Sequence, residues 1–362
     1  MSLHTLAARA RLSPGTAAGL LLCAAVFVVG LSWAKWMHYS SKAVDLGQTH
    51  RWPGSDILAT GGVTAGDPPS WHAAATFFHA YVASIWPALV VALLLSAAVQ
   101  AFLPPSWPAR LLNRRSTLSS ALAGGAAGMP SMMCTCCAAP VAATLRRNGV
   151  TPPAAVAYWL GNPLLNPAVL VFLLMVAPWQ WSVTRLVIGL VTVIGAAAAV
   201  GLATRDPLAA TPAPRPELVD RPGPGRFRPS PGRFAAALAK LALTLLPEYA
   251  ILVLVIGAYR GRLLTITEPS HRGLLIVVVV SLVGVLVVLP TAGEIPILLS
   301  LAVLGASPGV LGALLITLPA VSLPGAAMVA RSFGPKATAI TAGVVVAAGL
   351  LSAAALSSLS SL

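Results

Sequence analysis

The chain has 362 residues, of which 57% are apolar and only 9% are charged, and its formal net charge is +14. Soluble domains carry about 25% charged residues, so this composition predicts an integral membrane protein and excludes an ordinary soluble one. The lysines and arginines lie in short loops between apolar stretches, which is the positive-inside pattern of membrane proteins and not a nucleic-acid-binding face.

The first apolar run covers residues 17–33 and follows two arginines. We interpret residues 1–34 as a retained N-terminal span, although Ser32-Trp33-Ala34 also resembles a signal-peptide cleavage site. In both cases the polar segment 35–76 is expected to form an external loop. Its histidines are interpreted as solvated loop residues and not as metal ligands. These histidines are His38, His50 and His72.

Eight further apolar stretches fall into two groups, and the second group begins about 156 residues after the first. The first group covers residues 77–103, 118–147, 154–177 and 183–203, and the second covers 235–258, 272–304, 309–329 and 338–357. Four matched positions are Pro140 and Pro296, Gly149 and Gly305, Pro152 and Pro308, and Pro163 and Pro319. The pattern predicts an internal duplication, with membrane repeat 1 at 77–203 and membrane repeat 2 at 235–362. Corresponding apolar segments interrupted by proline and glycine indicate a transporter site at a repeat interface.

The two groups are separated by a hydrophilic linker over residues 204–234. It holds eight prolines, six arginines and three acidic residues. This composition predicts a disordered connector, and its basic character places it in the cytoplasm.

Basic residues also determine the expected topology of the second stretch in each group. Arginines flank both ends of 118–147, so both ends are expected in the cytoplasm. The limb Ala138–Arg147 would cover only about 15 Å of a roughly 30 Å hydrocarbon core, which predicts a re-entrant hairpin. Three true spans per repeat then reverse the second repeat. The predicted fold is an all-α integral membrane protein of two inverted repeats, each with three spans and a re-entrant hairpin, plus one N-terminal span. One basic loop, Arg260–Arg272, falls on the predicted outer side.

Three cysteines, Cys134, Cys136 and Cys137, lie within four residues at the first break. Cys134 and Cys137 would share one helical face, while Cys136 would point elsewhere unless the backbone breaks. Thiolates are soft ligands for Cu(I), Zn and similar thiophilic species, so we predict substrate binding by all three and metal ligation by Cys134 and Cys136. Cysteine also packs well as a small residue, which is the alternative.

Two glutamates lie inside apolar stretches. Glu248 is in the middle of 235–258 beside Pro247, and Glu294 is in the second break at the position that matches Ala138. An intramembrane carboxylate is costly and indicates function, so both are candidate proton carriers and Glu294 is also a candidate substrate ligand. The alternatives are a surface position for Glu294 and a structural hydrogen bond for Glu248.

Asn162 and Asn166 flank the proline-rich break at Asn162–Pro167. Their amides either bind a polar substrate or satisfy backbone groups that the prolines leave free. We expect both hairpins to reach the middle of the bilayer, which would place the cysteines close to Glu294 and near the two asparagines.

The run from Pro130 through Cys134-Thr135-Cys136-Cys137-Ala138-Ala139-Pro140 to Leu145-Arg146-Arg147 and Gly149 resembles a known signature. It is similar to the C-S-C-G-x-x-P…L-R-R-x-G pattern of a family of bacterial predicted permeases that includes the organoarsenical efflux permease. Pro163-Leu164-Leu165-Asn166-Pro167 resembles the SPLLNP element of that family.

The resemblance covers roughly residues 75–357 and implies a permease, with trivalent organoarsenicals as one candidate cargo. Cys134 and Cys136 fall on the cysteine pair of the family. Cys137 replaces a usual glycine and Asn162 a usual small residue, so the pattern leaves the substrate open.

These observations predict a secondary-transporter-like permease that exports a small solute, such as a thiophilic metal or metalloid species, across the bacterial plasma membrane. Its expected partners are the lipid bilayer and this substrate, with no nucleic acid, no cofactor and no enzymatic activity. A channel or a subunit of a larger membrane assembly is the first alternative. A membrane thiol oxidoreductase is the second, and it would need a redox partner and a resolving cysteine pair.

Overall fold

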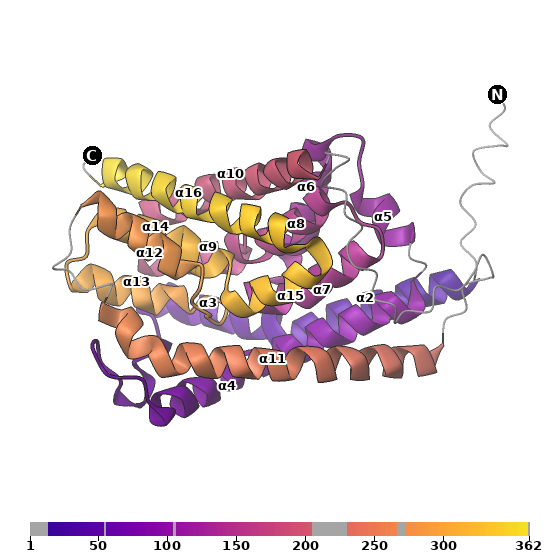
Figure 1. Ribbon diagram of the computed structural model, residues 1–362, viewed down its shortest axis with the longest axis horizontal. Helices are drawn as coiled ribbons and strands as arrows, with labels where there is room; N and C mark the ends of the chain where they lie inside the picture. The colour runs from indigo at the N-terminus through magenta and orange to yellow at the C-terminus, as the bar shows by residue number, and fades with distance from the viewer. Residues whose placement is uncertain (1–13, 54–55, 104–105, 205–229, 266–272, 361–362) are drawn as a thin grey trace.

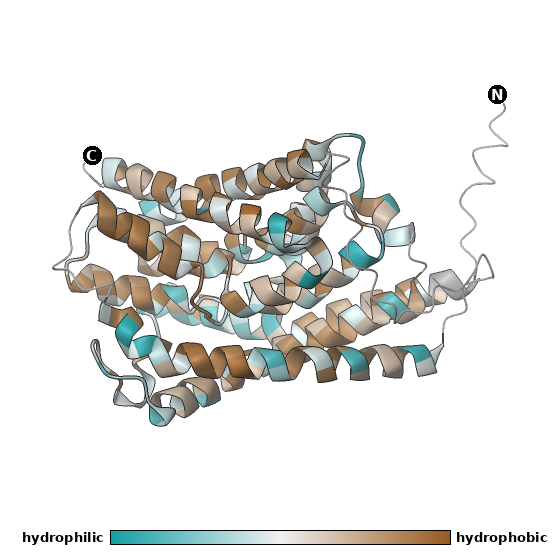
Figure 2. Cartoon of the chain, in the orientation of Figure 1, coloured by the Kyte–Doolittle hydropathy of each residue, from teal (hydrophilic) through white to brown (hydrophobic). Residues whose placement is uncertain are grey.

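The computed structural model describes residues 14–53, 56–103, 106–204, 230–265 and 273–360, and within these ranges it contains helices and no strands (Figure 1). Six helices are long and apolar enough to cross a membrane, or seven if the pair α14 and α15, bent by 51°, forms one span. Apolar residues dominate the long helices on all sides (Figure 2). The all-helical membrane class expected from the sequence is confirmed.

The elements group as the sequence suggests. The N-terminal elements are α2 (Pro14–Leu31), the π-helical turn η2 (Ser32–Trp36), α3 (Met37–Thr49) and the 3-10 turn η3 (Ile57–Gly62). The first half continues with α4 (Trp71–Phe102), α5 (Ser106–Leu112), α6 (Thr117–Gly128), η4 (Met129–Ser131), α7 (Thr135–Arg147), α8 (Pro152–Leu164), α9 (Pro167–Val176) and α10 (Trp179–Ala203). The second half contains α11 (Pro231–Thr265), α12 (Leu274–Gly284), α13 (Glu294–Val303), α14 (Pro308–Ala320), α15 (Leu323–Phe333) and α16 (Pro335–Leu359).

Helix boundaries recur between the two halves. Both bounds of α8 and α10 return 156 residues later as the bounds of α14 and α16. Pro152 and Pro308 each occupy the first helical position, where a missing N–H costs nothing. Gly149 and Gly305, just before these helices, have left-handed φ values of 84° and 86°. The proline and glycine pattern therefore sets the same helix starts twice.

The N-terminal helix is longer than the sequence suggests. A polar loop was expected from residue 35, but η2 and α3 continue the helix to Thr49. Trp36 Nε1 donates a hydrogen bond of 2.9 Å to the Pro130 carbonyl, which ties this helix to the first break. Polar side chains here face other protein groups, so a low mean hydropathy misleads the sequence argument. Most of the predicted linker, by contrast, lies outside the described residues, and its last residues begin α11.

Small residues bring α6 and α8 into close contact. Gly124 and Gly128 are four residues apart and lie on one helical face, and each faces the backbone of α8. A Cβ at Gly128 would lie 2.6 Å from the Tyr158 carbonyl oxygen. This small-xxx-small packing fixes the end of α6, and with it the first break, against α8.

The basic residue at the predicted outer side has a structural explanation. Arg260 is fully buried and belongs to α11, which continues past the predicted span. Its guanidinium donates to the Thr60 carbonyl and, at 3.1 Å, to Thr76 Oγ1. Arg260 therefore fastens α11 to the segment before α4 and is not a free loop charge of the kind that determines topology.

Candidate functional site

The first break lies between η4 and α7. Met132 adopts a left-handed conformation with φ 48°, and Cys134 is extended with φ −72° and ψ 165°. The left-handed residue ends the helical path of α6 and η4, and α7 begins at Thr135. Cys134 therefore stands at the N-terminal end of α7, with the other two cysteines in its first turn.

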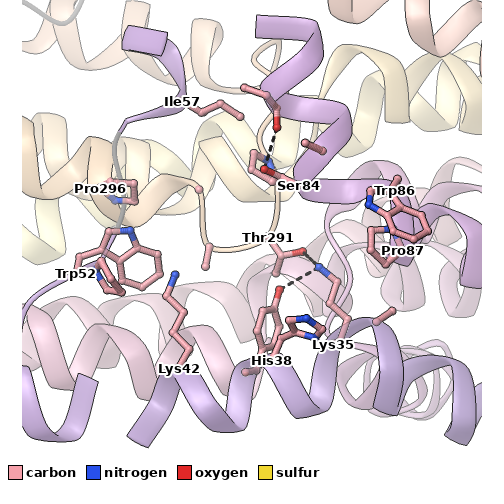
Figure 3. A pocket seen from close by; sticks show the side chains of 18 of the residues that line it. Lys35, His38, Lys42, Trp52, Ile57, Ser84, Trp86, Pro87, Thr291 and Pro296 are labelled. Carbon is pink, nitrogen blue, oxygen red and sulfur yellow. Dashed lines mark hydrogen bonds between the residues drawn. The ribbon is translucent and has the colours of Figure 1, made fainter. Parts of the chain in front are cut away.

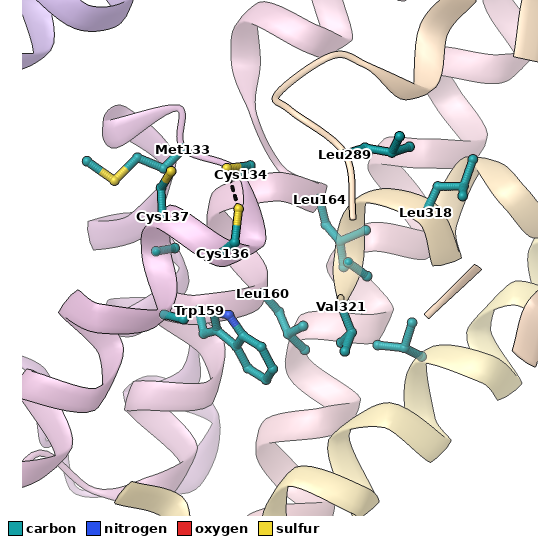
Figure 4. Close-up of a cluster of buried hydrophobic side chains, with 14 of the residues drawn as sticks. Met133, Cys134, Cys136, Cys137, Trp159, Leu160, Leu164, Leu289, Leu318 and Val321 are labelled. Atoms are coloured by element: carbon teal, nitrogen blue, oxygen red, sulfur yellow. Dashed lines mark hydrogen bonds between the residues drawn. The ribbon is translucent and has the colours of Figure 1, made fainter. Parts of the chain in front are cut away.

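The three thiols converge at this helix start. Their sulfur atoms all lie within 4.8 Å of one another, and all three side chains are buried. Cys134 Sγ and Cys136 Sγ are 3.0 Å apart, and Figure 4 shows the pair facing each other beside Leu164 and Leu289. Because the backbone leaves helical geometry at Cys134, Cys136 meets Cys134 instead of pointing away. Three soft ligand atoms are therefore placed where one thiophilic atom could contact them.

Two tyrosines extend the thiol cluster toward other helices. Tyr81 OH, from α4, lies 3.0 Å from Cys136 Sγ and 2.5 Å from the hydroxyl of Tyr249 in α11. Both rings are buried. Sequence reasoning did not identify these residues, because nothing local distinguishes a tyrosine in an apolar helix that faces a thiol 55 residues away.

The second break, between α12 and α13, carries an ion pair. Glu294 begins α13, and its Oε1 lies 2.7 Å from Arg185 Nη1 in α10. Arg185 Nη2 also donates a hydrogen bond of 2.8 Å to the Pro163 carbonyl. Both charged side chains are buried, so Glu294 is not at the surface. Sequence reasoning missed Arg185, although a lone arginine in the apolar stretch 183–203 was a usable signal.

The two breaks meet at a narrow cavity of about 10 Å³. Cys134 lies on one side of it, and Arg185 and Glu294 lie on the other. The matched residues Pro163 and Pro319 also line it. The structure thus brings Cys134 and Glu294 together as expected, and it adds a guanidinium to the thiol and carboxylate groups.

The two asparagines satisfy protein groups at the breaks. Asn162 Oδ1 accepts a hydrogen bond from Ser131 Oγ, and its Nδ2 donates 2.9 Å to the Tyr158 carbonyl. Asn166 caps α9, because its Oδ1 accepts from the backbone N–H groups of Ala168 and Val169. The Asn166 Nδ2 group is buried and has no hydrogen-bond partner within the described part of the chain. Asn162 thus supports the first break, while Asn166 keeps one donor for a ligand.

Glu248 lies apart from the narrow cavity. Its Oε2 is 3.0 Å from Arg331 Nη2, at a position where Glu248 is 22% and Arg331 52% exposed. Its charge is therefore balanced by an arginine near α15. A proton-carrying role for Glu248 stays a prediction.

A larger cavity of about 590 Å³ lies next to the second break (Figure 3). Lys35, His38 and Lys42 line it from the N-terminal helix, where sequence analysis expected a solvated loop. Lys35 Nζ donates to Tyr39 OH at 3.0 Å and to Thr291 Oγ1 at 3.1 Å. The large and narrow cavities share Pro290, Thr291 and Ala292 as wall residues, so the second break separates them.

Comparison with known proteins gives two matches. Residues 70–215, which include the cysteine cluster, match a family described as a predicted permease, ArsP_1. The UPF0718 protein YraQ of Escherichia coli strain K12 is 38% identical over 331 residues, covering 90% of this chain and 91% of that protein. No solved structure matches the chain.

Proposed function

The chain belongs to the predicted permease family that includes the UPF0718 protein YraQ, and on that premise we propose that it exports a small thiophilic solute. The transporter would be a secondary one in the bacterial plasma membrane, and a trivalent organoarsenical is a candidate cargo. The apolar helices and the family support a membrane permease. The solute, the export direction and the membrane are the proposed part.

The observation that carries this proposal is the meeting of three thiols with the narrow cavity between the breaks. Soft metals and trivalent metalloids prefer thiolate ligands, and the sulfur atoms lie within 4.8 Å of one another. Arg185 and Glu294 would contact the rest of the cargo from the opposite wall. Because thiolates bind and thiols do not, binding should weaken as the pH falls.

The proposed architecture is the inverted repeat with two re-entrant hairpins. The 156-residue recurrence of helix bounds supports a duplication. Asn113, before α6, bonds to both sides of the turn after α7: its Nδ2 donates to the Gly149 carbonyl and its Oδ1 accepts from Thr151 N–H. The start and end of the first hairpin therefore lie side by side. In Figure 1, α6 and α7 reach one end of the bundle, and α12 and α13 extend toward the other.

This topology predicts that the linker and the C-terminus lie on opposite sides of the membrane. Reporter fusions at Ala210 and Leu362, both outside the described residues, measure this directly. Two reporters active on the same side would contradict the inverted repeat, because an odd number of spans must separate these positions.

The decisive experiment on cargo replaces the thiols one group at a time. Uptake of phenylarsine oxide into everted membrane vesicles would be measured for Cys134→Ser, Cys136→Ser and the double variant. We expect the double variant to lose uptake at normal protein abundance, because a hydroxyl does not replace a soft thiolate. Cys137→Ser should lose less, since Cys137 departs from the family pattern.

Cys23→Ser is the matched control, because Cys23 is also buried but lies in α2, outside the thiol cluster. It should transport normally. Full uptake by the Cys134→Ser/Cys136→Ser variant would mean that the thiols only pack, and the thiophilic cargo would then be wrong.

A further inference from the structure

The large cavity beside the second break has a wall of one charge sign. Lys35, His38 and Lys42 line it, and no carboxylate does so within the described part of the chain. Glu294, the nearest acidic residue along the chain to its Pro290–Gly293 wall, is already paired with Arg185. The remaining acidic residues of the described ranges lie outside the cavity wall. They are Asp45, Asp56, Asp67 and Glu248.

Lys35 is the most constrained of these basic groups. Its side chain is 6% exposed, and two of its three ammonium donors are used by the neutral hydroxyls of Tyr39 and Thr291. A buried ammonium without a counter-charge is expensive, because neutral dipoles replace only part of its hydration. The third donor and the uncompensated charge both require an anionic ligand.

Lys42 is held at the same cavity by an aromatic contact. Its ammonium lies 3.5 Å from the centre of the Trp52 ring, an arrangement that fixes the cation but does not neutralise it. Figure 3 shows the Lys42 and Lys35 side chains rising from one helix into the cavity, with His38 between them. Two ammonium groups and one imidazole are thus arranged around an open space.

We propose that this cavity binds a small oxyanion through Lys35, Lys42 and His38. The inference rests on the proposed transport function and deepens it, since it assigns the cargo an anionic group in addition to a thiophilic one. Lys35 interacts electrostatically with Cys134 and Cys137, so both recognition elements act within one region. A cargo could hold its oxyanion group at Lys35 while it passes the second break toward the thiols.

The oxyanion can come from a free solute or from the phosphate of a lipid headgroup. Trp33 and Trp86 also line the cavity, are about half exposed, and pack edge to face with ring centres 5.4 Å apart. Exposed tryptophans of this kind gather at headgroup level. Both sources offer the same chemistry to the lysines, and the experiment must separate them.

The test uses the full chain in phosphatidylcholine nanodiscs. Inorganic phosphate and sulfate are titrated while tryptophan fluorescence is followed, because Trp52 lies under the Lys42 ammonium. We expect saturable binding that Lys35→Met and Lys42→Met each weaken by at least about tenfold, since each removes a charged hydrogen-bond donor. Lys35→Arg should retain binding. Lys336→Met is the control for net charge, because Lys336 is exposed and lies outside the cavity wall.

A second arm measures the lipid source by native mass spectrometry of protein from phosphatidylglycerol-containing membranes. Retained phosphatidylglycerol that is lost in Lys35→Met, without saturable inorganic anion binding, would support the oxyanion site and assign it to a headgroup. Equal binding of both probes to Lys35→Met, Lys42→Met and Lys336→Met would overturn the site. If Lys35→Met fails to fold, Lys42→Met decides, because its side chain is only half-buried.

The anion site and the thiol transporter can fail separately. Loss of phenylarsine oxide uptake in the cysteine variants, with no anion binding in the nanodiscs, would refute the anion site alone. Anion binding that depends on Lys35, with normal uptake in the cysteine variants, would refute the thiophilic cargo alone.

Discussion

The two breaks occupy corresponding places in the chain but carry different chemistry. The first, after Pro130, presents three thiols and no charge, and the second, after Pro290, presents a hydroxyl and a carboxylate. The first is held by neutral hydrogen bonds from Trp36 and Ser131, whereas the second is held by contacts from Arg185 and Lys35. A repeated backbone thus supplies soft ligands on one side of the narrow cavity and charge on the other, and neither half alone carries both.

The largest predicted effect tests the charged break. Arg185→Met would leave Glu294 buried without its partner and should lower the free energy of unfolding by about 3–5 kcal/mol. Thermal unfolding in detergent measures the loss. The double variant Arg185→Met/Glu294→Gln should recover most of it, because no unpaired charge then remains buried.

Arg331→Met provides the contrast on a partly exposed pair. The Arg331–Glu248 pair is open to solvent, so its loss should cost no more than about 1 kcal/mol. Equal destabilisation by Arg185→Met and Arg331→Met would mean that the second break does not depend on its buried charge.

The next prediction compares the close packing behind each break. Gly128 and Gly284 are 156 residues apart, and a Cβ on Gly128 would meet the Tyr158 carbonyl, whereas one on Gly284 would meet the Thr317 side chain. We expect Gly128→Ala to cost about 1–3 kcal/mol, because backbone cannot yield as a side chain can. Gly284→Ala should cost less in the same unfolding measurement.

Gly343→Ala is the control for this pair, since Gly343 lies within α16 with open space around it. Alanine should stabilise this helix by up to about 1 kcal/mol. If Gly128→Ala also stabilises the protein, the close approach of α6 to α8 is not what holds the first break.

The smallest effect concerns the matched helix caps. Asn166 accepts two backbone N–H groups at the start of α9, and Ser322, 156 residues later, accepts one at the start of α15. Alanine at either position should cost about 1 kcal/mol of stability. Phenylarsine oxide uptake should fall further for Asn166→Ala than for Ser322→Ala, because only Asn166 holds a free amide donor. Equal uptake by the two variants would restrict Asn166 to capping.

The sequence by itself determined the membrane class, the helical fold and the position of both breaks. Prolines and glycines act on their own backbone, so Pro152 and Pro308 start helices and the interruptions follow from local sterics. The cysteine cluster was also visible, because its three members are neighbours in the chain. The sequence further suggested the proximity of Cys134 and Glu294, through the repeated pattern and not through any local signal.

Only the tertiary structure decided which distant side chains meet. Helices that are apolar on all sides give no periodic signal for the face that packs inward, so the Tyr81–Tyr249 pair and the Arg185–Glu294 pair had no local signature as pairs. The polar segment after residue 34 was expected in water, yet Lys35 is buried there because hydroxyls from Tyr39 and Thr291 receive its ammonium. Burial of a polar group depends on partners that the fold supplies, and in this chain Thr291 comes from 256 residues away.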